Sequence, residues 1–202
     1  MKWLTLILAL AACAAPQVSL DPPAQPPPAK DYIDLLKKWT RHGQLQSDFE
    51  EALSVDATMM SPEFRAAFAE RYISVYKLSP EEAGRKRAEI LSDAADQFSF
   101  HVETSTHAWQ LNDLSGTKSV WRISLVDDKG REITTKDIHL KRTAREFDAA
   151  FFPYQNVFSR SWRILIPRTF ADGTLLYGPN TRSLTLRFAG PQGSVDLVWQ
   201  LH

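Results

Sequence analysis

The hydrophobic pattern of this chain changes its period once, at Phe98, and this change limits the folds that the chain can adopt. Before Phe98, apolar residues recur at the three- and four-residue spacing of amphipathic helices. After Phe98, they alternate with polar residues, as in strands that bury one face. The pattern predicts an α+β protein, with a helical segment over residues 30–97 followed by a β domain over residues 98–202.

The helical segment is predicted to hold three to four helices. The first has one apolar face, made by Tyr32, Leu35, Leu36 and Trp39. Gly43 is predicted to stop this helix, and a second, short helical piece is expected around Leu45, Phe49 and Leu53. Two further helices are expected after Ser61 and Ser79, because each serine offers a capping hydroxyl and is followed by proline and then acidic residues.

The β domain is predicted to hold seven to eight short strands. Turn sequences rich in glycine and aspartate separate the alternating runs at residues 127–130, 172–173 and 190–193. Short strands at this spacing favour an antiparallel, immunoglobulin-like β-sandwich in which each sheet has one solvated face. The Cys-Trp-Cys pattern of true immunoglobulin domains is absent from the sequence.

Charge and cysteine content exclude several kinds of site. The chain has 24 basic and 24 acidic residues, and therefore lacks the basic excess expected of a nucleic-acid-binding protein. Cys13 is its single cysteine, so neither an internal disulfide nor a metal site built from several thiolates can form. We expect no nucleic-acid partner and a fold held together by packing.

Residues 1–13 have the pattern of an export leader. Lys2 supplies a positive charge, residues 3–10 are almost all apolar, and the small residues Ala11 and Ala12 suit a cleavage site. The apolar run is too short to span a bilayer, which takes about 20 residues. The segment Leu10-Ala11-Ala12-Cys13 resembles the lipobox of bacterial lipoproteins.

This resemblance implies a signal peptide over residues 1–12, cleavage between Ala12 and Cys13, and acylation of Cys13. The lipid would then be the membrane partner of the chain. Ala14 stands where an aspartate favours retention at the inner membrane, which implies the outer membrane, facing the periplasm. The inner membrane and the cell surface are the alternative locations, and a secretory leader with a chance cysteine is the alternative to lipidation.

Residues 13–29 follow as the acylated cysteine and a proline-rich tether. They hold six of the 12 prolines and are predicted to be extended, at about 3.1 Å per residue. The alternative is that the three consecutive prolines, residues 26–28, dock in an aromatic groove of a partner.

An aromatic segment, residues 147–162, interrupts the strand pattern. We consider Phe151, Phe152, Tyr154 and Phe158 as a possible interaction surface, since aromatic residues are enriched at interfaces. The favoured alternative is a connection that folds over one end of the sandwich and fills its core.

No motif for catalysis, for a cofactor or for a metal is found. His101, Glu103 and His107 are the best candidate zinc set, but alternation places them on the solvated face of a strand that ends near Thr106. Seven basic residues could instead face an anionic lipid, although acidic residues between them favour ion pairs: Lys136, Lys141, Arg142, Arg145, Arg160, Arg163 and Arg168.

The sequence thus favours a non-catalytic interaction or structural module of the cell envelope that binds another envelope protein. A lipoprotein that binds a small ligand, such as an acyl chain or a sugar, is the alternative. An envelope enzyme of unrecognised type is the third hypothesis, and it requires a cleft with convergent polar groups.

Overall fold

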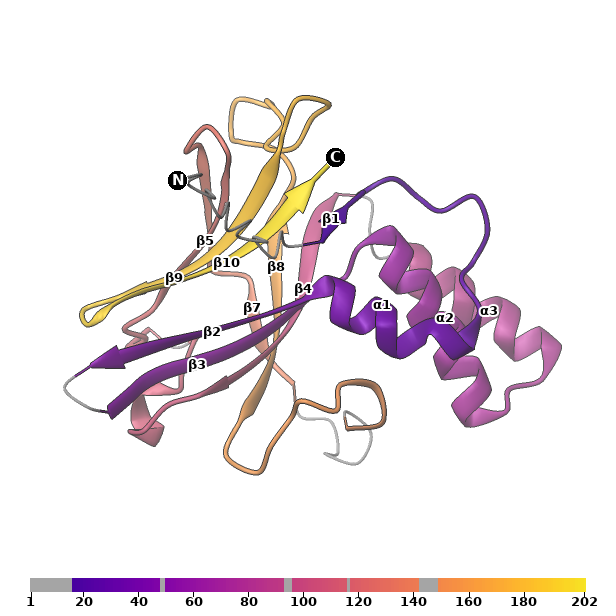
Figure 1. The fold of residues 1–202 in the computed structure, drawn as a ribbon, viewed down its shortest axis with the longest axis horizontal. Helices are drawn as coiled ribbons and strands as arrows, with labels where there is room; N and C mark the ends of the chain where they lie inside the picture. Colours follow the sequence, from indigo (N-terminus) through magenta and orange to yellow (C-terminus); the bar gives the residue numbers. More distant parts are fainter. Residues whose placement is uncertain (1–15, 48–49, 93–95, 116, 142–148) are drawn as a thin grey trace, which may run out of the picture.

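The computed structural model describes residues 16–47, 50–92, 96–115, 117–141 and 149–202. It has a mixed α+β architecture, in which three α-helices are grouped beside two five-stranded sheets (Figure 1). Residues 1–15 lie outside the described residues, and with them the predicted cleavage site at Ala12 and the lipidation site at Cys13.

The second and third of the helices begin at the predicted serine caps. Helix α1 spans Tyr32–Trp39, α2 spans Pro62–Tyr76 and α3 spans Pro80–Ser92, and short 3-10 turns occur at Ala29–Asp31 (η1) and Trp109–Leu111 (η2). The hydroxyl of Ser61 accepts a hydrogen bond from the Phe64 amide at 3.0 Å. Ser79 and Glu82 bond reciprocally, side chain to backbone amide, in a capping box.

The prediction that residues 30–97 are helical throughout is wrong. Residues Thr40–Ser47 form strand β2 and residues Glu50–Met59 form strand β3, which pair antiparallel. Gly43 is therefore not a helix stop. A Cβ atom on Gly43 would lie 2.5 Å from Cγ1 of Val195, so this position needs glycine because another strand packs directly on its backbone.

Sheet B contains β2 and β3 and continues across the predicted boundary at residue 98. Its order is β2-β3-β4-β8-β7, with β4 at Gln97–Ser105, β8 at Arg160–Pro167 and β7 at Ile138–Leu140. β3 pairs with β4 from Ser54 opposite Ser105 to Met59 opposite Phe100. The helical part and the β part therefore share one sheet.

Sheet A has the order β1-β10-β9-β5-β6. Its strands are β1 at Gln17–Val18, β10 at Gly193–Leu201, β9 at Ser183–Gly190, β5 at Arg122–Asp127 and β6 at Glu132–Thr135. All its pairs are antiparallel except β1 with β10. Side chains from both sheets and from α1 and α2 meet in one apolar core, in which the indole of Trp199 donates to the Trp39 carbonyl at 2.9 Å.

Candidate functional site

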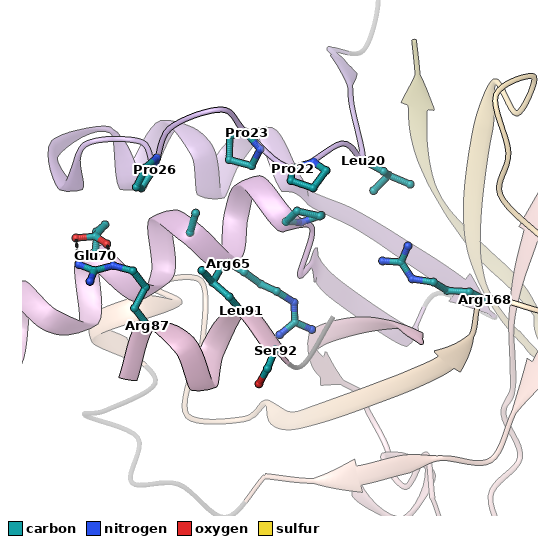
Figure 2. Close-up of a pocket in the computed structure, with 12 residues that line it drawn as sticks. Leu20, Pro22, Pro23, Pro26, Arg65, Glu70, Arg87, Leu91, Ser92 and Arg168 are labelled. Atoms are coloured by element: carbon teal, nitrogen blue, oxygen red, sulfur yellow. Dashed lines mark hydrogen bonds and ion pairs between the residues drawn. The ribbon is translucent and has the colours of Figure 1, made fainter. Parts of the chain in front are cut away.

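The proline-rich segment, predicted to be an extended tether, is docked on the fold over its described part. Val18 and Leu20 are buried, and β1 is hydrogen-bonded to the end of β10. Burial of these two apolar side chains gives the segment a hydrophobic reason to pack instead of extending into solvent. Residues 20–26 then pass over α2 and α3 (Figure 2).

A groove of about 540 Å³ lies between residues 20–26 and the two helices, and we call it the proline groove (Figure 2). Its volume is within the range of small-molecule sites, which are mostly apolar with a few polar groups. The apolar residues that line it are Leu20, Pro22, Pro23, Pro26, Pro62, Ala66 and Leu91. The groove thus offers an apolar surface that the segment 20–26 does not fill.

The shape of the proline groove follows from the spacing of its residues on the helices. Pro62, Ala66 and Glu70 are four residues apart and form one stripe along α2. Eight residues of α-helix span about 12 Å. Arg87 and Leu91, also four residues apart, provide the wall on α3. A site built along two helical stripes is elongated and suits a chain-like ligand.

The two ends of the proline groove differ in charge. At one end, the Arg87 guanidinium donates to both carboxylate oxygens of Glu70, at 2.7 and 3.2 Å (Figure 2). At the other end, Arg168 follows β8 and its guanidinium lies 5.0 Å from the ring centre of Phe98. The buried Nε of Arg168 has no hydrogen-bond partner among the described residues. Burial lowers the pKa of Arg168, and the charges of Tyr177 and Asp96 oppose this effect.

Arg65 lies beside the proline groove and also lines a second, more polar pocket of about 380 Å³. Arg65 is 3% exposed, and it donates to the carbonyls of Met60 and Ile90 at 2.9 and 3.3 Å. These bonds link the start of α2 to α3, so we assign Arg65 a structural role in shaping both pockets.

A buried polar cluster occupies the outer side of sheet B, where the sequence predicted a solvated face. His101 and Glu103 are 5% and 2% exposed, and Nε2 of His101 lies 3.1 Å from Oε1 of Glu103. Glu103 also accepts hydrogen bonds from the hydroxyls of Ser159, at 2.9 Å, and Ser161. The prediction of exposure is wrong because residues 149–159 cover this side of β4, and the ring of Phe152 stacks on His101 with centres 3.6 Å apart.

The predicted zinc set does not come together. His107 follows the end of β4 at Ser105, is 65% exposed at its side chain and lies 3.6 Å from Glu50. The described residues contain no group of three or more histidine, aspartate, glutamate or cysteine side chains placed to hold a metal ion. His101 and Glu103 instead bind the segment that covers them.

The four aromatic residues considered as an interaction surface separate into two environments. Phe151 and Phe152 are buried at 0% and 2% exposure, so for these two residues the possible interaction surface is wrong and the favoured alternative, a place in the core, is confirmed. Tyr154 packs against the core, and its hydroxyl lies 2.7 Å from that of Thr58. Burial raises the pKa of Tyr154 well above its usual value. Phe158 is 76% exposed and remains, with Val157, the apolar part of this segment at the surface.

No protein-family model matches this chain, and the comparisons with curated proteins and with solved structures return no match. What the site can bind is therefore inferred from the residues that line it.

Sequence reasoning did not identify the proline groove. Two signals were present in the sequence: the proline segment itself, and Arg168, which was grouped with six other basic residues as a set that could face an anionic lipid. Residue spacing along the sequence could not show that the proline segment and Arg168 lie together, because the groove joins residues from four parts of the chain. None of the helices in the described part is both long and apolar enough to cross a bilayer.

Proposed function

We propose that the chain is a lipid-anchored protein of the bacterial envelope, held at the outer membrane through Cys13 and facing the periplasm. The pattern of the leader and the lipobox-like segment Leu10-Ala11-Ala12-Cys13 support this location. Several acyl chains on one cysteine, at about 0.8 kcal/mol per buried methylene, make such an anchor effectively permanent.

The anchor predicts a near-complete change in location for Cys13→Ser. We expect the variant to leave the membrane fraction and to lose incorporation of labelled palmitate, measured by fractionation and autoradiography of the producing cells. Ala14→Asp is the matched control, because it changes the neighbouring residue and keeps the thiol. A Cys13→Ser protein that stays in the membrane fraction would contradict the lipid anchor.

For the folded part, we propose a non-catalytic role, the binding of an apolar, chain-like ligand in the proline groove. The elongated apolar groove between residues 20–26 and the stripes of α2 and α3 is the observation that carries this proposal. It favours ligand binding over the adaptor hypothesis, because only Phe158 of the four aromatic residues predicted to form its surface is exposed. Two sheets around one core, antiparallel except for the pair of β1 with β10, also support an immunoglobulin-like relationship, which we keep as a proposal.

The groove predicts which substitution blocks binding. Ala66→Trp places a large side chain in the groove, and we expect it to weaken binding of the fluorescent apolar probe N-phenyl-1-naphthylamine by about tenfold or more, since ligand contacts of a few kcal/mol are lost. Dodecanol should displace the probe from the unmodified chain.

Ala88→Trp is the matched control, because Ala88 is exposed on the same pair of helices and does not line the groove. Thermal unfolding of both variants reports whether either substitution disturbs the fold. Equal probe affinity in the two variants would place the binding site elsewhere.

A further inference from the structure

We propose that the ligand of the proline groove is a fatty acid, whose carboxylate pairs with Arg168 while its alkyl chain lies along α2 and α3. This inference rests on the proposed function and adds the chemistry of the head group. Two observations support it. The two ends of the groove differ in charge, and at one end the Nε atom of Arg168 has no hydrogen-bond partner among the described residues.

The end formed by Glu70 and Arg87 is electrostatically complete. The Arg87 guanidinium makes two hydrogen bonds to the Glu70 carboxylate, so each charge already has its counter-ion. A charged head group placed here would have to compete with a formed bidentate pair. The methyl end of an alkyl chain is the part of the ligand that suits this end.

The end formed by Arg168 is incomplete. Nε of Arg168 is buried and has no hydrogen-bond partner, and no carboxylate of the described residues lies at ion-pair distance from this guanidinium. The nearby Asp96 contributes its backbone carbonyl, which accepts from the Arg168 amide at 3.2 Å. The side chain of Arg168 is half-buried and the charge of Asp96 acts on it through space, but its buried Nε is a donor without an acceptor, which is costly. The lowered pKa of Arg168 has the same cause, its removal from water.

A carboxylate complements the Arg168 guanidinium in charge and in geometry. The guanidinium is planar and always ionised under ordinary conditions, and it binds carboxylates through two parallel N–H···O bonds. Arg87 and Glu70 compensate each other, so Arg168 is the cationic group of the described lining that favours an anion at its end of the groove. Figure 2 shows the Arg168 guanidinium turned toward Leu20, at the mouth of the apolar part. A ligand with a carboxylate head group and an alkyl chain would pair with Arg168 and contact the apolar lining of the groove at the same time.

The test compares laurate with dodecanol, which have the same chain length and differ in the head group. Binding of each to the full mature chain, carrying Cys13→Ser so that no attached lipid competes, is measured by displacement of N-phenyl-1-naphthylamine. We expect laurate to bind about tenfold or more tightly than dodecanol, as a charge-assisted hydrogen bond predicts. Arg168→Gln should weaken laurate binding by about tenfold more than dodecanol binding and so remove this preference, and Arg168→Lys should restore part of it.

Arg187→Gln is the matched control, because Arg187 forms an exposed pair with Asp196 on sheet A and does not line the groove. It should keep the preference for laurate. Equal affinity of the unmodified groove for laurate and dodecanol would overturn the fatty-acid proposal and leave an apolar groove, whereas failure of both to bind would overturn the proposed function itself. The comparison on the unmodified groove decides the proposal even where an Arg168 variant fails to fold.

Discussion

Phe152→Ala is expected to reduce the free energy of unfolding by about 3–5 kcal/mol, the usual loss for removing a buried phenylalanine. Phe152 is 2% exposed, and its ring stacks on His101 and lies 6.0 Å from the ring of Phe68 on α2. The side chain of Lys141 covers it, with Nζ 5.6 Å from the ring centre. Truncation therefore leaves a cavity between sheet B and α2, which neighbours on rigid elements cannot fill.

Phe158→Ala is the matched control for this prediction. It removes the same atoms from the same segment, but Phe158 is 76% exposed, so its loss should change stability by less than about 0.5 kcal/mol. Urea unfolding followed by tryptophan fluorescence measures both variants. Similar losses for Phe152→Ala and Phe158→Ala would contradict the division of the aromatic segment into core and surface.

Glu103→Ala is expected to be similarly severe, at about 3–5 kcal/mol, because it breaks a buried charged network by removing one member. The carboxylate of Glu103 accepts from Ser159 and Ser161 and lies beside His101, so the substitution removes the shared partner of these three groups, of which His101 and Ser161 are buried. Residues 149–159 are bound to sheet B partly through these contacts. We therefore expect faster proteolysis of this segment in the variant, in addition to a lower urea midpoint.

Glu50→Ala provides the comparison at the surface. Glu50 also lies near a histidine, His107, but both side chains are more than half exposed. Exposed pairs contribute about 0–1 kcal/mol, so this variant should unfold close to the parent chain. Glu103→Ala and Glu50→Ala with equal midpoints would show that the buried cluster does not stabilise the covering segment.

Much of the secondary structure could be predicted because its causes are local. The caps at Ser61 and Ser79 act through hydrogen bonds to residues three positions away, and the start of α2 and α3 follows from them. Strand β3 carried an equally local signal, since Leu53, Val55, Ala57 and Met59 alternate with polar residues. The helical interpretation of this stretch overlooked that period, and the polar sequence of β2 concealed its partner.

Local sequence was sufficient to predict the starts of α2 and α3 and the period-two strands after Phe98, since each depends on neighbouring residues. The lipobox-like pattern is equally local and stays a prediction. Which faces are buried depends on tertiary packing. Residues 149–159 cover the side of β4 that was predicted to be solvated and bury it. The proline segment, α2, α3 and Arg168 come from distant parts of the chain and together form the groove. Burial and convergence of this kind depend on long-range packing, which the periodicity of a single segment does not encode.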